Sequence, residues 1–197
     1  MRLQDQLRFT LEIDKLKSVF RQSLLVDGSR RENSAEHSWH IAIMATTFLE
    51  YASGPIDVAR VQKMLLLHDV IEIDAGDTYA YDAEGIATRE ARERAAADRI
   101  FGILPDDQAA EYRALWDEFE AQATKDSLYA NALDRLQPLL LNFHSGGKTW
   151  LEHGITSAQV LDRMAPVKTG APAFWSVVVE IVETAVRNGW LKQSEVE

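Results

Sequence analysis

The amino-acid sequence predicts an all-α protein of about six to nine helices, folded as a single domain. Apolar residues recur at helical spacing through most of the 197 residues. No segment shows the sustained alternation of apolar and polar residues between hairpin turns that half-buried strands require. No repeat, low-complexity segment or shift in composition marks a second domain. We therefore expect one domain over residues 1–197.

The expected helices follow one another along the chain. Apolar spacing, caps and chain breaks predict helices over residues 6–20, 34–51, 57–71, 83–103, 105–123, 126–144 and 171–190. Ser34 is the expected N-cap of the second helix, and Pro55 or Asp57 begins the third. The fourth is rich in strong helix formers. Residues 21–33 are polar and predict a loop, and Thr156 begins a segment with capping-box spacing.

Composition and charge limit the chemistry that this protein can perform. The chain has no cysteine, which excludes disulfides, thiolate metal sites and cysteine nucleophiles. Any metal ion must therefore be held by nitrogen and oxygen ligands. The formal net charge of −10 would repel a long polyanion. We therefore expect no nucleic-acid polymer as partner. The charge still allows a small phosphate ester where a metal ion or a few arginines concentrate positive charge, and the simplest interpretation is that the acidic surface keeps the protein soluble.

No targeting or membrane segment is expected from the sequence. The first six residues are too polar for the apolar stretch of a signal peptide. The longest apolar runs, such as Met64–Leu67, are far too short to cross a bilayer. We expect a cytoplasmic protein with no membrane partner.

Histidine and acidic residues cluster at three places in the chain. His37 follows Glu36 at the start of one predicted helix, and the pair His68-Asp69 lies near the end of the next. Glu72 lies one helical turn beyond that pair, and Asp77 follows in a loop. One further acid, Asp134, stands among apolar neighbours in the middle of a much later helix.

These residue types suit metal-assisted hydrolysis. Imidazole nitrogen and carboxylate oxygen are good ligands for first-row divalent metal ions. A metal ion in such a site lowers the pKa of bound water from 15.7 towards about 7, which makes hydroxide available at neutral pH. Carboxylates that do not bind the metal can then transfer protons, and Glu72 and Asp77 are placed for that work.

Other residues of the same types have structural explanations. A lone histidine is more often structural, and we expect this of His40, His144 and His153. We expect Asp74 to support the end of its helix and Arg30-Arg31 to be solvated loop charge. The aromatic residues after Gly146 are expected in the core or at a subunit interface.

The ordered set resembles the HD-domain metal-dependent phosphohydrolases, and within them the branch of 5′-deoxynucleotidases and related hydrolases. The matching stretches are Glu36-His37, residues 67–77 (LHDVIEIDAGD) and residues 132–137 (ALDRLQ). Residues 16–21 (LKSVFR) look like the entry helix of that family. The resemblance spans about residues 7–142, and residues 148–197 are expected to form a C-terminal helical extension without a recognised motif.

The resemblance implies roles for the clustered residues. It implies one divalent metal ion (Mn, Co, Zn, Ni, Fe or Mg) held by His37, His68, Asp69 and Asp134. Glu72 would orient or activate the attacking water, and Asp77 would assist proton transfer to the leaving oxygen. Arg21 would bind the substrate phosphate, because a guanidinium matches phosphate geometry. A homodimer is also implied.

One departure from the family concerns sugar selection. In the deoxynucleotidases a tryptophan closely follows the phosphate-binding arginine and helps to select the sugar. Here Gln22, Ser23 and Leu24 occupy that stretch. The resemblance therefore predicts a phosphohydrolase without predicting deoxyribose selectivity.

Three functions compete. Our leading hypothesis is hydrolysis of a nucleotide-like phosphomonoester, probed first with nucleoside monophosphates, with metal-bound water as nucleophile. The second is phosphodiester or pyrophosphate hydrolysis, for which two-metal sites generally use additional histidines. The third is a metal-stabilised binding module without turnover, in which Glu72 and Asp77 would be dispensable.

Overall fold

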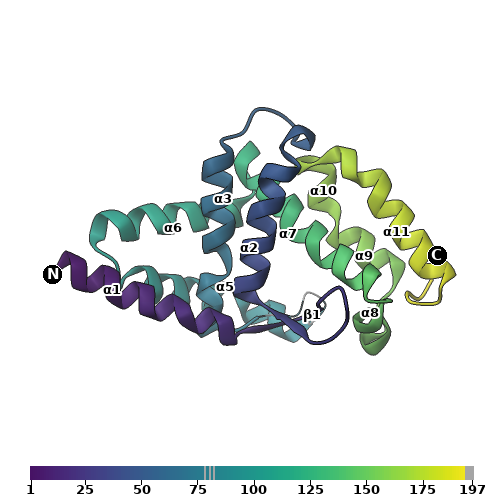
Figure 1. Ribbon diagram of the computed structural model, residues 1–197, viewed down its shortest axis with the longest axis horizontal. Helices are drawn as coiled ribbons and strands as arrows, with labels where there is room; N and C mark the ends of the chain where they lie inside the picture. The colour runs from purple at the N-terminus through teal and green to yellow at the C-terminus, as the bar shows by residue number, and fades with distance from the viewer. Residues whose placement is uncertain (78, 80, 82, 194–197) are drawn as a thin grey trace.

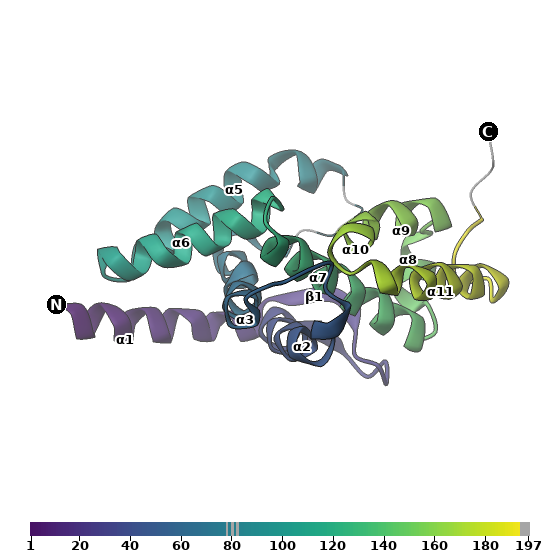
Figure 2. The same cartoon turned by 90° about the horizontal axis from the view of Figure 1, so that it is seen from above.

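The computed structural model is an elongated assembly of helices, and it describes residues 1–77, 79, 81 and 83–193 (Figure 1). The N-terminal end is built from α1 (Arg2–Ile13), α5 (Ala83–Phe101) and α6 (Asp106–Ala121). The middle contains α2 (Ser34–Thr47), α3 (Val58–Leu67) and α7 (Lys125–His144). The opposite end contains α8 (Lys148–His153), α9 (Ser157–Arg163), α10 (Ala165–Gly170) and α11 (Trp175–Arg187) (Figure 2).

The all-α class is confirmed, and shorter elements complete the fold. In the described residues, seven α-helices have ten or more residues, which agrees with the expected six to nine. The additional elements are the short helix α4 (Glu72–Ala75) and 3₁₀ turns η1 (Asp14–Ser18), η2 (Leu49–Tyr51), η3 (His68–Ile71) and η4 (Pro172–Phe174). Sequence periodicity does not resolve one-turn elements, because a single turn repeats no apolar position.

The expected loop over residues 21–33 is wrong in part, because a small hairpin forms there. Strand β1 (Phe20–Leu24) pairs antiparallel with β2 (Arg31–Asn33), and Phe20 lies opposite Asn33. This pairing requires extended backbone at Phe20, so the first helix ends at Ile13 rather than at residue 20. Arg21 therefore lies on a strand and not on a helix. The strands are too short to show alternation.

Helix caps are close to the predicted positions. The N-cap of α2 is Asn33 rather than Ser34, because the Asn33 side chain accepts a hydrogen bond from the Glu36 amide in a capping box. Asp57 caps α3, as expected. The predicted capping box at Thr156 and Gln159 begins α9. The remaining boundaries differ from prediction by a few residues, as fraying ends usually do.

The buried apolar residues form two clusters that meet at the turn η3. The first cluster joins α2, α3 and α7 to the C-terminal helices and extends from Ile41 to Leu191. The second lies among α1, α5 and α6 and includes Val70 and Ile71. Leu67, directly before η3, belongs to the first cluster. The pair His68-Asp69 therefore lies at the junction of the two clusters.

The C-terminal helices share a core with the motif-bearing helices, although the proposed single-domain boundary stays a prediction. Trp150 on α8 is buried in the first cluster, and Phe174 packs against Phe48 with ring centroids 5.0 Å apart. The described helices include none that is both long and apolar enough to span a membrane.

Candidate metal centre

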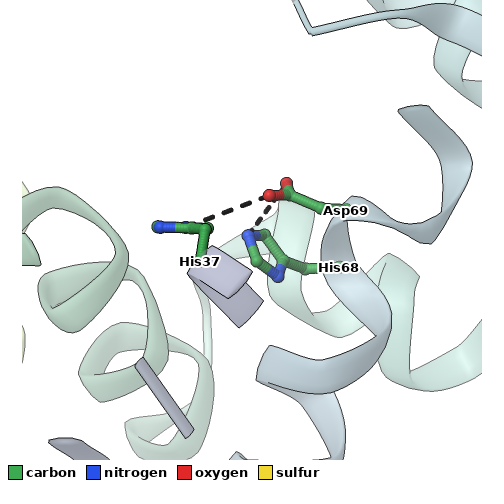
Figure 3. A group of neighbouring side chains, drawn as sticks. All are labelled: His37, His68 and Asp69. Carbon is green, nitrogen blue, oxygen red and sulfur yellow. Dashed lines mark ion pairs between the residues drawn. The ribbon is translucent and has the colours of Figure 1, made fainter. Parts of the chain in front are cut away.

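Three buried ligands come together from two elements distant in sequence. His37 lies in the first turns of α2, while His68 and Asp69 lie on η3. The backbone tightens from α-helix to 3₁₀ geometry at His68, and both side chains of the pair reach the same site. One ligand atom from each of the three lies within 4.8 Å of the others (Figure 3). Such spacing suits one metal ion.

The fourth predicted ligand, Asp134 on α7, borders this group. Its Oδ1 atom is 2.9 Å from His37 Nε2 and 3.5 Å from His68 Nε2. Its other oxygen, Oδ2, accepts a hydrogen bond from Arg135. Oδ1 therefore faces the two histidines, while the hydrogen bond from Arg135 fixes Oδ2.

The tautomer of His37 follows from its second neighbour. His37 Nδ1 is 3.0 Å from Gln137 Oε1, and the Gln137 amide nitrogen donates to Glu32 at 2.7 Å. The amide oxygen of Gln137 therefore accepts the Nδ1 proton of His37. The Nε2 atom of neutral His37 then has a free lone pair directed at the Asp134 carboxylate. Such anchoring of the remote nitrogen is typical of metal-binding histidines.

His68 is oriented in the same way. Its Nδ1 donates to the Leu65 carbonyl oxygen at 2.7 Å. Its buried Nε2 lies 2.9 Å from Asp69 Oδ1, yet makes no well-aligned hydrogen bond among the described residues. An unprotonated Nε2 would face carboxylate oxygens, which are also acceptors. A cation placed between these acceptors removes the conflict, so the donor set fits a divalent metal ion.

The pKa values of the three clustered ligands also indicate that the site favours a positive charge. Burial disfavours protonation of His68, but the nearby negative carboxylates of Asp69 and Asp134 outweigh it and raise its pKa to about 10. Burial and the charge of Arg21 lower the pKa of His37. Burial would raise the pKa of Asp69, but His68 and Arg21 hold it well below its usual value. In the protein without metal, a proton on His68 takes the place of the metal charge.

Arg21, predicted to bind phosphate, lies beside the metal ligands. Its guanidinium donates to Asp69 Oδ2 at 2.7 Å, and both side chains are largely buried. Its Nε atom is buried without a hydrogen-bond partner among the described residues. Arg21 therefore has donor capacity left for a ligand in the site.

The two predicted proton-transfer residues also border the centre. Glu72 accepts a hydrogen bond from Ser34 Oγ at 2.6 Å. Burial and the negative charge of Asp69 raise the pKa of Glu72 well above its usual value. Burial is also the main cause of the raised pKa of Asp77, and the charge of Asp69 adds to it. Both shifts favour the protonated form of the carboxyl group, in the direction that a proton donor requires.

Two connected cavities adjoin the ligands. The inner cavity, of about 40 Å³, is lined mainly by charged residues, among them His68, Asp69, Glu72, Arg89 and Glu93. The outer cavity, of about 90 Å³, has apolar and aromatic walls, among them Tyr79, Tyr81, Leu139, Trp150 and Val160. Both are bordered by Arg21, Asp77, Asp134, Arg135 and Arg163.

The residues given structural explanations mostly have structural contacts. Asp74 pairs with Arg99 at 2.8 Å, and Arg30 forms an exposed ion pair with Glu36. The spare histidines lie outside the ligand group: His40 borders Gln137, His144 contacts Phe143, and His153 stacks on Tyr79. In the described part of the chain they supply no second metal site.

Several residues at the site were not predicted to act there. Arg135 and Gln137 belong to the matched stretch 132–137, and the one-turn spacing of Gln137 from Asp134 was a usable signal. Glu32, which accepts a hydrogen bond from Gln137, and the cavity residues Arg89 and Arg163 carry no sequence signal, because only the tertiary fold brings them to the site. Trp150 is buried as expected, but it also forms part of the outer cavity wall.

The chain is similar to known proteins of one family. A model of the HD domain matches residues 13–175. The chain is 27% identical over 139 residues to 5′-deoxynucleotidase HDDC2 of Danio rerio, a match that covers 70% of this chain and 68% of that protein. It is 27% identical over 135 residues to 5′-deoxynucleotidase HDDC2 of Homo sapiens, a match that covers 68% of this chain and 65% of that protein.

A solved structure is more similar still. It is the crystal structure of a predicted metal-dependent phosphohydrolase from Magnetospirillum magnetotacticum MS-1, with 53% sequence identity and a TM-score of 0.92. The match covers 96% of this chain and 95% of that one. Since the HD domain model covers most of the sequence, the chain belongs to the HD domain family. The expected class, a metal-dependent phosphohydrolase, is confirmed.

Proposed function

We propose that this protein hydrolyses nucleoside 5′-monophosphates, using one divalent metal ion held by His37, His68, Asp69 and Asp134. The observation that carries the proposal is the orientation of both histidines, whose Nδ1 atoms are anchored while their Nε2 atoms face carboxylates. When bound, the metal ion supplies Lewis-acid stabilisation of the phosphoryl group and a nucleophile at neutral pH.

The protein's own residues supply binding and proton transfer. Arg21, with an unpartnered buried Nε, binds the phosphate of the substrate. Glu72 lies on the inner cavity wall, where its carboxyl group orients the attacking water. Asp77 borders both cavities and delivers a proton to the leaving oxygen of the sugar.

The shape of the site supports a nucleotide over a small inorganic phosphate. A charged inner cavity opens beside an outer cavity with aromatic and apolar walls. A nucleoside monophosphate has the same division into a charged phosphate and a flat, less polar base. The named HDDC2 relatives are 5′-deoxynucleotidases, which adds support for this substrate class. Gln22 and Ser23 line the outer cavity where the family's tryptophan would follow Arg21, so we propose no deoxyribose selectivity.

A phosphatase panel crossed with a metal series tests the proposal. Protein stripped of metal is reloaded with Mn, Co, Zn, Ni, Fe or Mg, and phosphate release is measured from ribo- and deoxyribonucleoside monophosphates. We expect release with at least one metal, and a fall on the order of 10²–10⁴ in kcat for Glu72→Gln and Asp77→Asn with metal content unchanged. No release by protein with confirmed metal would refute the proposal.

Assembly and location are two further predictions. We propose a homodimer through exposed apolar side chains at one-turn spacing, Leu3, Leu7 and Leu11 on α1 and Trp39 and Ile43 on α2. Light scattering should give twice the chain mass, and Trp39→Glu should give the monomer.

A cytoplasmic location, tested by fractionation, is likewise a prediction from the sequence.

A further inference from the structure

Four arginines surround the inner cavity, and they come from four different elements. Arg21 lies on β1, Arg89 on α5, Arg135 on α7 and Arg163 on α9. Three have a carboxylate partner. Arg21 pairs with Asp69 at 2.7 Å, Arg89 pairs with Glu93 at 2.7 Å, and Arg135 pairs with Asp134. The fourth, Arg163, is not used by the proposed metal ion or by the phosphate at Arg21, so its position needs another explanation.

Arg163 differs from the other three because it forms no ion pair with a carboxylate in the described part of the chain. In the described residues, no carboxylate oxygen lies within 4.0 Å of its guanidinium and no hydrogen bond engages it. It is half-buried, and the charged groups that act on it are the positive Arg135 and Arg89 and the negative Asp134. Burial and then the charge of Arg135 lower its pKa to about 9, which leaves it charged at neutral pH. A half-buried cation beside like charges is costly, and an anion would relieve that cost.

The position of Arg163 separates it from the phosphate site at Arg21. Arg135 and Arg163 border a third cavity of about 350 Å³, which we call the side cavity. Its other lining residues are Tyr81, Gln122, Gln159, Asp162 and Pro166. Arg21 and the histidines do not line this cavity. The two guanidiniums thus border both the inner cavity and a polar space that no predicted metal ligand lines.

We propose that Arg163 and Arg135 form a second anion subsite, which binds a second phosphate group carried by the substrate. This inference rests on the proposed function and refines its substrate class to nucleotides with two phosphates. Water adds to the scissile phosphorus, the bond to the leaving oxygen breaks, and that oxygen takes the proton. The second phosphate stays with the leaving group, held by the two guanidiniums, and the scissile one departs as inorganic phosphate.

Kinetics with three matched substrates tests the subsite. These are deoxyadenosine 5′-monophosphate, the 5′-diphosphate and the 3′,5′-bisphosphate, so that the last two distinguish an anhydride-linked from a sugar-linked second phosphate. We expect kcat/KM to be at least about tenfold higher for one doubly phosphorylated substrate, mainly through KM. Arg163→Gln should bring the ratio of doubly to singly phosphorylated substrate close to one. Arg187→Gln, an exposed arginine on α11, is the matched control and should leave the ratio unchanged.

A binding measurement separates failure of this inference from failure of the proposed function. By calorimetry, protein loaded with metal should bind inorganic pyrophosphate more tightly than phosphate, and Arg163→Gln should abolish the difference. Hydrolysis of the monophosphate with no preference for a second phosphate would overturn the inference alone. Equal loss for all three substrates in Arg163→Gln would assign Arg163 to the scissile phosphate and overturn it as well. If no substrate is hydrolysed, the calorimetric difference still decides the subsite.

Discussion

The inner and outer cavities share several lining residues, but the outer cavity also draws on a later part of the chain. Most of the inner wall comes from residues 21–135, which include every predicted metal ligand and proton-transfer residue that lines it. The outer wall draws on residues 138–164, a stretch that begins in α7 and ends after α9. The chemistry is therefore encoded in the motif-bearing segment, and the space for the rest of the substrate depends on the C-terminal helices.

This difference implies that the two regions should respond separately to substitution. Changes to the inner cavity should alter metal affinity and kcat. Changes to the outer wall should alter KM and substrate choice while the metal stays bound. The following predictions test that separation, from the largest expected effect to the smallest.

Loss of a metal ligand should have the largest effect. Asp69→Ala removes a carboxylate that faces both histidines, so we expect metal content near zero and a fall in kcat on the order of 10⁴. Elemental analysis and phosphate release provide the two measurements. Asp74→Ala, in the adjacent short helix and paired with Arg99, is the control and should retain metal. Full activity in Asp69→Ala would exclude it as a ligand.

Metal affinity should rise with pH. The metal must displace the proton from His68, whose pKa is raised to about 10 by Asp69 and Asp134 despite burial. Below that value each unit of pH should strengthen apparent binding about tenfold per proton displaced, or roughly a hundredfold from pH 6 to pH 8. Competition with a chelating dye, calibrated at each pH, measures this. Affinity that is flat or that falls over this range would contradict the proposed ligand state of His68.

Loss of Gln137, which orients His37, should lower metal affinity less than loss of a metal ligand. Gln137→Leu removes the acceptor for the Nδ1 proton of His37 while conserving side-chain size, so metal affinity should fall roughly 10–100-fold. Gln108→Leu, on α6 and away from the centre, is the control. Unchanged affinity in Gln137→Leu would show that Gln137 does not orient the ligand.

The outer wall should affect substrate binding without affecting the metal. Tyr81 lines the outer and side cavities, and Tyr81→Leu removes an aromatic face. We expect KM for nucleotides to rise roughly fivefold to tenfold, with metal content unchanged and Tyr81→Phe close to wild type. A change in metal affinity in Tyr81→Leu would contradict the separation between the two regions.

The smallest effect is expected at the start of α9, the helix that carries Arg163. Thr156→Ala removes a capping box and should cost about 1 kcal/mol of stability, or about 2–4 °C in Tm. Thr156→Ser retains the hydroxyl and should stay close to wild type. Calorimetric melting measures both. A large loss of metal affinity in Thr156→Ala would contradict the expected independence of the metal centre from the C-terminal helices.

The sequence predicted the metal-binding region better than the substrate-binding region for a physical reason. His68 and Asp69 are adjacent, and Glu72 lies one turn later, so local spacing alone places them on one face. His37 and Asp134 could be added because the resemblance joined the stretches. Arg163 had no such signal, because α9 reaches the cavity only through packing of the C-terminal helices on α7.

The fold was predicted with the same limits. The long helices follow from apolar spacing, whereas the hairpin β1–β2 depends on pairing across a turn, such as that of Phe20 with Asn33. That hairpin explains why Arg21 lies on a strand. The roles of Arg21, Glu72 and Asp77 stay predictions, and the structure supplies their positions, contacts and pKa directions.

The position of η3 has a mechanical consequence. Leu67 before it packs in one apolar cluster, and Val70 and Ile71 within it pack in the other. A metal ion shared by His68, Asp69 and ligands on α2 and α7 would cross-link this junction. Binding would then stabilise the native state by RT ln(1 + [M]/Kd), and the melting temperature would depend on free metal concentration. The ion would then stabilise the fold at this junction as well as take part in catalysis.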